Sequence, residues 1–348
     1  MSTFAVTLER IGSIQPIPDA DRIEIAVLEG MDFQFVVPRG RYRPGDPVLY
    51  FPVDSLLPPP LIERLGLSGR LAGHDQDRVK TIRLRGQISQ GIVADPDIIP
   101  AGMNEPEVIT THLGVRKYEP PEQVTNDAIL TRLPDGQSVY DIEGADRYVD
   151  VAALLMDQPV WISEKVEGSN LWVRATPEGE VSVGQRNHAL TPKEGVEHTF
   201  HKIVRRERLD AFAADLARAA GAPALVYGEA LGPGIQGNIY GLKEHRALVF
   251  DVRVGSGWFS PNALRAAVLG FFGTRGEALL VPSLAFDRTL RDWLGGQSIK
   301  LASDGTSLLA GRAREGIVIK PMSEAVVAGF GRLVIKQRSP AYLAKSEF

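Results

Sequence analysis

The sequence predicts two domains, a small all-β barrel followed by a larger α+β domain built on antiparallel sheets. Residues 1–100 form short β-branched and aromatic runs separated by Pro-Asp, Gly-Asp and other glycine-rich turns. Beyond about residue 125, strand patterns return and a helical pattern interrupts them. At 348 residues, of which 44% are hydrophobic and 24% charged, the chain is long enough for two domains.

The first domain is expected to contain six strands, at residues 4–14, 22–28, 33–37, 47–52, 79–84 and 91–94. The insert that begins at Pro58 predicts a short helix over residues 61–65. Five or six strands with one intervening helix are typical of an OB-fold barrel, whose open face commonly binds nucleic acids.

A linker is predicted where the strand pattern fades, between Pro100 and Gln123. This segment is polar and contains Glu119-Pro120-Pro121-Glu122, which favours a loop. We therefore expect an OB-fold nucleic-acid-binding domain over residues 1–118 and a second domain over residues 119–348.

The second domain is expected to be mixed. Residues 149–156 predict a short helix, and the alanine-rich residues 209–220 predict a longer helix closed by Gly221 as its cap. Strand patterns return around Val160, Leu171, Val181, Leu225, Ala247, Gly316 and Leu333.

Composition excludes several classes of protein. The chain has no cysteine, which rules out disulfides, thiolate zinc sites and cysteine nucleophiles and fits a reducing compartment. The six histidines show no His-x-x-x-His spacing, so no zinc site built by the protein is expected. No signal segment and no apolar run long enough to cross a bilayer is present, which predicts a cytoplasmic protein without membrane contact.

Charge limits how the chain can bind nucleic acid. Its net charge of −4 argues against a protein that coats DNA indiscriminately, because such proteins depend on a large positive field. Residues 78–85, with four lysines and arginines, are a candidate for local binding. Residues 201–208 are also basic, and we interpret them as a solvated face.

Lys165 is the candidate nucleophile. It follows the apolar residues 159–162 and precedes Gly168 by three residues. A lysine at the end of a buried strand, before a turn that glycine tolerates, is placed to present an amine to a phosphorus atom. A surface lysine before a turn is the alternative interpretation of this spacing alone.

Charged residues at the ends of later strands support the first interpretation. Lys336 and Arg338 are two residues apart on one strand, so their side chains leave the same face roughly 7 Å apart, a spacing that suits two phosphate groups. Glu229 and Glu315 are carboxylates at the ends of strands, where they can contact Mg²⁺ or a ribose hydroxyl. Because residues 315 and 320 have opposite parity in a regular strand and face opposite sides, Lys320 is a doubtful member of the site.

Taken together, residues from about 125 to 340 resemble the covalent nucleotidyltransferase superfamily of ATP-dependent DNA ligases, RNA ligases and mRNA capping enzymes. Glu164-Lys165-Val166-x-Gly168-x-Asn170 resembles RNA ligases most, in particular the bacterial type with an N-terminal OB module. The resemblance implies an ATP-grasp-like nucleotidyltransferase domain that uses ATP as a substrate, with Mg²⁺ or Mn²⁺. It assigns catalysis to Lys165, metal binding to Glu315, and ATP or AMP binding to Glu164, Asn170, Arg186, Glu229, Phe250, Lys336 and Arg338. Core packing remains an equal alternative for Phe250.

The expected function is ATP-dependent sealing of 5′-phosphate and 3′-hydroxyl RNA ends, at nicks in duplexes, through a lysyl-AMP intermediate and an adenylylated 5′ end. The expected partner is RNA or an RNA-containing nicked duplex, and no obligate protein partner is evident. An ATP-dependent DNA ligase is the alternative within the same class. A non-catalytic OB-fold RNA-binding protein is the alternative from another class.

Overall fold

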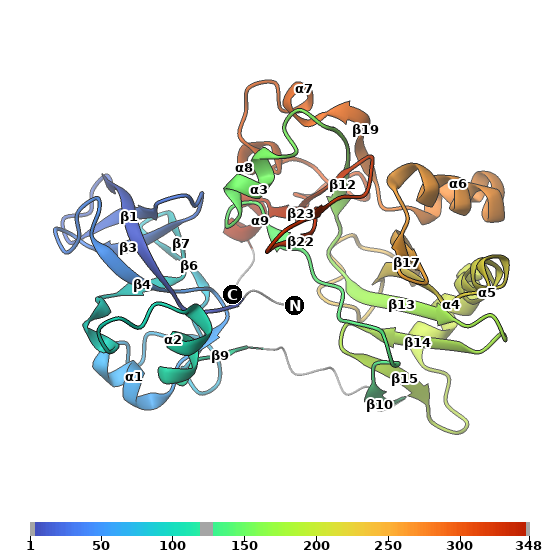
Figure 1. Ribbon diagram of the computed structural model, residues 1–348, viewed down its shortest axis with the longest axis horizontal. Coiled ribbons are helices and arrows are strands. Elements are labelled where there is room, and N and C mark those ends of the chain that lie inside the picture. The colour runs from blue at the N-terminus through green and yellow to red at the C-terminus, as the bar shows by residue number, and fades with distance from the viewer. Residues whose placement is uncertain (1–3, 119–127, 346–348) are drawn as a thin grey trace. The chain divides into compact units, whose positions relative to one another are not determined.

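A computed structural model describes residues 4–118 and 128–345 of the protein (Figure 1). The chain divides into two compact units. Among the described residues, the first unit holds 4–118, 145–150 and 343–345, and the second holds 128–144 and 151–342. The predicted domain boundary at residue 119 lies outside the described residues and stays a prediction. No helix within the described ranges is both long enough and apolar enough to span a membrane.

The first unit is the predicted antiparallel barrel. Its sheet has the strand order β3-β2-β1-β4-β8. These strands are β1 (Thr7–Pro16), β2 (Ile23–Leu28), β3 (Gln34–Pro38), β4 (Pro47–Phe51) and β8 (Ile92–Ala94). A hairpin of β6 (Thr81–Leu84) and β7 (Gln87–Gln90) lies against β3, because the Val36 amide donates to Ser89 Oγ and Gln34 Nε2 donates to the Ile88 carbonyl, both at 3.0 Å. The hairpin therefore nearly closes the barrel.

The predicted helix in the insert is α1 (Pro59–Arg64). It begins two residues earlier than expected because prolines occupy its first two positions, where a missing N–H removes no helical hydrogen bond. A 3₁₀ turn follows β8 at Pro96–Ile98, and β5 (Ser55–Leu56) pairs with β9 (Arg116–Lys117).

The prediction of a linker between Pro100 and Gln123 was wrong where a helix forms in the middle of this segment. Residues Pro106–His112 form α2, and the part from residue 119 onward lies outside the described residues. Proline starts this helix, and Ile109 and Leu113, four residues apart, place their side chains in the buried core of the first unit. A short amphipathic pattern inside a polar segment was mistaken for a loop.

The second unit contains two sheets, and their pairings are antiparallel except between β11 and β23. The seven-stranded sheet has the order β10-β15-β14-β13-β16-β17-β18, and the five-stranded sheet has the order β11-β23-β20-β12-β19. The first comprises β10 (Ala128–Arg132), β13 (Ser169–Ala175), β14 (Val181–Gln185), β15 (His188–Pro192), β16 (Ala224–Leu231), β17 (Arg246–Val254) and β18 (Gly257–Trp258). The second comprises β11 (Glu143–Gly144), β12 (Pro159–Lys165), β19 (Ser283–Thr289), β20 (Gly316–Pro321) and β23 (Ile335–Arg338). The seven predicted strands are present.

Most of the remaining helical residues belong to the second unit, while helical residues 149–150 and 343–345 belong to the first. The predicted helix over residues 209–220 is α5 (Leu209–Ala220), and Gly221 ends it with a φ of +62°. The prediction at 149–156 corresponds to α3 (Val149–Ala153). The other elements are α4 (Thr199–Glu207), α6 (Pro261–Phe272), α7 (Leu290–Leu294), α8 (Ile299–Ala302), α9 (Pro340–Lys345), a 3₁₀ segment at Gly273–Leu279, and the pair β21 (Val326–Val327) and β22 (Gly331–Arg332).

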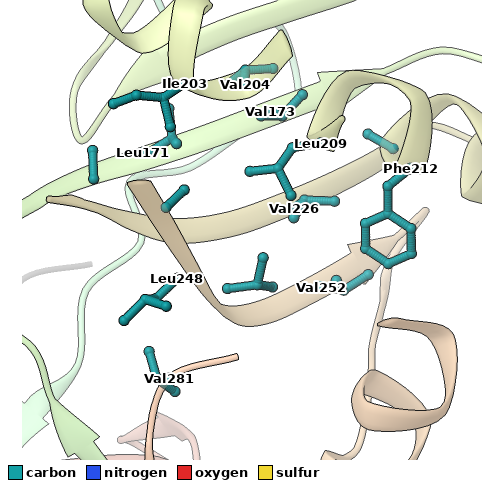
Figure 2. Close-up of a cluster of buried hydrophobic side chains, with 14 of the residues drawn as sticks. Leu171, Val173, Ile203, Val204, Leu209, Phe212, Val226, Leu248, Val252 and Val281 are labelled. Atoms are coloured by element: carbon teal, nitrogen blue, oxygen red, sulfur yellow. The ribbon is translucent and has the colours of Figure 1, made fainter. Parts of the chain in front are cut away.

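The main core lies between α4, α5 and one face of the seven-stranded sheet (Figure 2). Leu171 and Val173 of β13 and Val226 of β16 point toward Leu209 and Phe212 of α5. Because side chains alternate along a strand, the residues between these apolar positions leave the opposite face of the sheet. The helices therefore cover one face, and the other face carries a second buried cluster of Trp172, Leu225 and Tyr227 together with Asn170 and Glu229.

Candidate active site

A pocket in the second unit gathers most of the predicted site residues. Strands of both sheets line it: β12, β13, β16 and β17 contribute Lys165, Asn170, Glu229 and Phe250, and β20 and β23 contribute Val318, Lys320 and Lys336. Arg186, in the turn between β14 and β15, completes this group. Two predicted residues lie beside the pocket: Glu315 contacts Lys165, and Arg338 contacts Glu315.

Lys165 is the last residue of β12 and is not a surface lysine. Its Nζ lies 2.5 Å from Glu315 Oε1, and only 23% of its side chain is exposed. Three residues later the chain passes so close to β16 that a Cβ on Gly168 would lie 2.5 Å from the Ala230 carbonyl oxygen. The Lys-x-x-Gly spacing therefore has a steric cause, since only glycine allows this approach beside the amine.

The parity argument that made Lys320 a doubtful member of the site was wrong. Lys320 lines the pocket, because Glu315 precedes β20 and the regular alternation of that strand does not include it. At the junction, a Cβ on Gly316 would lie 2.1 Å from the Gln337 carbonyl oxygen, so the backbone of β20 packs unusually close to β23. Parity counted from Glu315 failed because Glu315 lies before the first residue of the strand.

Asn170 and Glu229 face each other directly across β13 and β16. Asn170 Oδ1 is buried and makes no hydrogen bond with any described residue. Burial raises the pKa of Glu229 to about 8, Lys165 opposes the rise, and Glu315 adds to it. Glu229 is therefore protonated at neutral pH and can donate a hydrogen bond, while Asn170 offers an unused acceptor beside it.

Three cations surround the same space. Lys336 and Arg338 are opposite Val318 and Gly316 of β20, so they occupy one face of β23 as predicted. Burial lowers the pKa of Lys336 to about 8, and the nearby Lys165 and Arg338 charges contribute to this. Arg338 Nε lies 3.9 Å from Glu315 Oε1, and Arg186 Nη2 lies 2.7 Å from Asp141 Oδ2.

Phe250 and Glu164 each serve a structural contact. Phe250 lines the pocket and also packs against the Tyr140 ring, with 5.2 Å between ring centroids, so the core contact is present and stacking on adenine stays a prediction. Glu164 leaves the face of β12 opposite to Lys165, and its Oε2 accepts a hydrogen bond from the Leu308 amide at 2.9 Å. Its other oxygen is buried and makes no hydrogen bond with a described residue.

Sequence patterns missed a buried ionic network under the pocket. Asp251, fully buried, accepts hydrogen bonds from Tyr140 Oη at 2.6 Å and Lys320 Nζ at 2.7 Å, and Arg332 Nη1 lies 2.5 Å away. Burial alone would raise the pKa of Asp251, but Lys320 and Arg332 outweigh this and hold it below its ordinary value. The only signal in the sequence was a carboxylate inside an otherwise apolar strand.

Comparison with known families decides the class of protein. The model of an OB-fold domain matches residues 5–96, and the model of the RNA ligase family matches residues 158–338, more than half of the chain. The chain belongs to the RNA ligase family. The predicted fold class is confirmed as well, since this ligase has the OB-fold domain followed by the ligase domain on antiparallel sheets.

Solved structures similar to this ligase include three forms of an RNA ligase from Naegleria gruberi. A mutant with ATP and Mn is 25% identical with a TM-score of 0.76, and the match covers 98% of each chain. An apo mutant is 25% identical with a TM-score of 0.76, covering 98% of this chain and 97% of that one. A mutant with AMP and Mn is 24% identical with a TM-score of 0.79, covering 98% of each. Curated proteins provide no match.

Proposed function

We propose that this ligase joins a 5′-phosphate end to a 3′-hydroxyl end of RNA through an AMP carried on Lys165. The observation that carries the proposal is the pocket itself, in which a partly buried lysine amine faces a carboxylate and lies among Asn170, Glu229 and Lys336. This set can bind a nucleotide and supply a nitrogen nucleophile to it.

The reaction proceeds in three displacements at phosphorus. The Lys165 amine, having lost a proton, attacks the α-phosphorus of ATP, and pyrophosphate leaves as the bond between nitrogen and phosphorus forms. The RNA 5′-phosphate then displaces the lysine and takes the AMP. Finally the 3′-hydroxyl attacks the 5′-phosphorus, AMP leaves, and the phosphodiester is complete. Each step depends on position and on compensation of negative charge.

The pocket residues suit separate parts of ATP. Phe250, held by Tyr140, offers an aromatic face for adenine. Protonated Glu229 and the unpartnered Asn170 Oδ1 offer a donor and an acceptor for ribose hydroxyls. Arg186, Lys336 and Arg338 supply positive charge for the phosphates, and Glu164 supports the wall of the pocket through its contact with Leu308.

The carboxylates fit a divalent ion that arrives with ATP. The similar Naegleria structures contain Mn with ATP or AMP. Within the described ranges no three acidic or histidine side chains gather as a closed metal site, but Glu315 provides the single carboxylate that Mg²⁺ or Mn²⁺ can use in addition to phosphates and waters. Bound there, the ion would offset charge that develops on the phosphates, with Glu315 as its ligand.

A sealing assay with matched nicks tests the proposal. The intact protein, with ATP and Mg²⁺, is offered duplexes whose nick has either RNA or DNA on each side. We expect sealing to require ribonucleotides at the 3′-hydroxyl end and to require ATP. Equal sealing of an all-DNA nick would favour a DNA ligase, and no AMP transfer with any substrate would favour the non-catalytic RNA-binding alternative.

The β6–β7 hairpin is the candidate RNA contact of the first unit. Residues 78–94 contain four lysines and arginines and no acidic residue. Arg78 is already engaged, since its guanidinium lies 2.6 Å from Asp54 Oδ1 and 3.5 Å from the centre of the Tyr118 ring. Arg83 and Arg85 are exposed, and neither forms an ion pair or a side-chain hydrogen bond within the described residues. Arg85 also has a φ of +49°, an unusual conformation for arginine.

Replacing Arg83 and Arg85 by alanine is expected to weaken binding of a nicked RNA duplex roughly tenfold. The slope of the logarithm of the binding constant against the logarithm of salt concentration should become shallower by the equivalent of about two phosphate contacts. Binding is measured by fluorescence anisotropy across a range of salt concentrations. The matched control replaces Lys202 and Arg205, exposed on α4 in the other basic segment. An unchanged salt slope in the hairpin variant, or an equal loss in the control, would contradict this assignment.

A further inference from the structure

Asp141 is an acidic residue placed between two cations of the pocket. Its Oδ2 lies 2.7 Å from Arg186 Nη2, and its Oδ1 lies 3.7 Å from Lys336 Nζ. The two cations come from different sheets, Arg186 from the turn after β14 and Lys336 from β23. One carboxylate therefore ties together two positive side chains that the backbone alone would leave independent.

The neighbouring residues hold Asp141 in this position. The backbone amide of the next residue, Ile142, donates a hydrogen bond to Asp141 Oδ1 at 3.1 Å, which restricts the orientation of the carboxylate. On the other side, Tyr140 donates its hydroxyl to Asp251 at 2.6 Å and packs its ring against Tyr227, with 4.8 Å between centroids. Asp141 is thus flanked by a side chain anchored in the buried network and by a backbone hydrogen bond.

The charge of Lys336 depends on this carboxylate. Burial lowers the pKa of Lys336 to about 8, and Asp141 is the main group that opposes the change, with a smaller contribution from Glu143. Lys165 and Arg338 act in the same direction as burial. Without Asp141, Lys336 would lose its proton at a lower pH, and a neutral amine binds phosphate poorly.

We propose that Asp141 is a positioning residue for the triphosphate of ATP, which orients Arg186 and Lys336 toward one another and keeps Lys336 protonated before the phosphates bind. The inference rests on the proposed function, because it requires both cations to bind phosphates. An acidic residue in a phosphate pocket would ordinarily repel the ligand, so that its removal would strengthen binding. The proposed role gives the opposite expectation, because removal of Asp141 should weaken the binding of ATP.

The test measures equilibrium binding of ATP with Mg²⁺ by calorimetry between pH 6.5 and 10. The parent protein carries Lys165→Ala, so that no AMP is transferred and the titration of the nucleophile cannot affect the result. Asp141→Asn is then added. We compare the dissociation constant for ATP of the variant with that of the parent. At the lowest pH we expect the variant to bind about threefold more weakly, because the orientation of Arg186 is lost. As pH rises, this ratio should increase to tenfold or more, because Lys336 loses its proton at a lower pH in the variant. The titration of ATP itself cancels in this ratio.

A second background separates charge from structure. Lys336→Arg keeps a permanent charge, so Asp141→Asn in that protein is expected to weaken binding by the same factor at every pH. Asp157→Asn, whose carboxylate pairs with Arg291 at the surface, is the matched control and should leave ATP binding unchanged. Thermal melts confirm that each variant is folded.

Two results would overturn the proposal. Tighter ATP binding by Asp141→Asn would show that the Asp141 carboxylate competes with the phosphates. A ratio of dissociation constants that does not change with pH in the background that retains Lys336 would show that Asp141 does not control the charge of this lysine. Failure of the proposed function appears differently, as no ATP binding by the Lys165→Ala parent or as unaltered ATP binding when Arg186 and Lys336 are both replaced by alanine.

Discussion

Replacing Lys165 by alanine is expected to abolish transfer of AMP to the protein, a loss on the order of 10⁵-fold or more, because no other nucleophile takes its place. With radiolabelled ATP and Mg²⁺, the unaltered protein should acquire an acid-labile label and the variant none. Sealing of a nick that carries an ordinary 5′-phosphate should be lost in parallel. The physical basis is the position of the amine, 2.5 Å from Glu315 and beside Glu229 in the same pocket.

The controls separate loss of the nucleophile from loss of the fold. Lys193→Ala removes an exposed lysine outside the pocket and should retain full labelling. Lys165→Ala itself should still seal an RNA end that already carries AMP, since the last displacement does not use the lysine amine as a nucleophile. Acid-labile label that persists on the Lys165 variant would disprove the assignment.

Replacing Asp251 by alanine is expected to lower the free energy of unfolding by about 3–5 kcal/mol, because it leaves Lys320 and Arg332 buried without their shared counter-charge. Lys320 and Asp251 have side chains that are 3% and 0% exposed, so water cannot replace the lost interaction. The melting temperature of the second unit should fall by roughly 10 °C. Chemical denaturation and calorimetry of the full chain measure the two effects.

This change should also affect the pocket. Lys320 Nζ donates to the Phe250 carbonyl at 2.7 Å, so its displacement would shift the strand that carries Phe250. We expect weaker ATP binding even where the variant remains folded. Asp135→Ala, an exposed aspartate 3.7 Å from Arg132, serves as the control and should change stability by less than about 0.5 kcal/mol. A cost below about 1 kcal/mol for Asp251→Ala would contradict the expected role of the network.

Much of the candidate site was predictable because its residues follow local rules. Strands end at charged residues in a fixed order along the chain, and this order could be read without knowing how the strands pair. The two-residue spacing of Lys336 and Arg338 places them on one face in any regular strand. Gly168 is required by contact with β16, and its distance from Lys165 is visible in the sequence.

The predictions failed where local rules were applied across an irregularity. Parity placed Lys320 outside the site because the count began at Glu315, which precedes β20 and lies outside the regular alternation of that strand. Helix α2 escaped notice because its apolar face contains few residues and is flanked by polar sequence, although Ile109 is completely buried. For α2, burial against the core of the first unit decided the local structure.

The sequence by itself determined the class of fold, the candidate nucleophile and the set of charged strand ends, because backbone periodicity and turn chemistry act over a few residues. Only the tertiary structure decided which charges meet. Asp141 lies 45 residues from Arg186 and still pairs with it, and Lys320 lies 69 residues from the carboxylate of Asp251 that it neutralises. Electrostatic interactions depend on distance in space and on burial, and neither quantity is encoded in the spacing of residues along the chain.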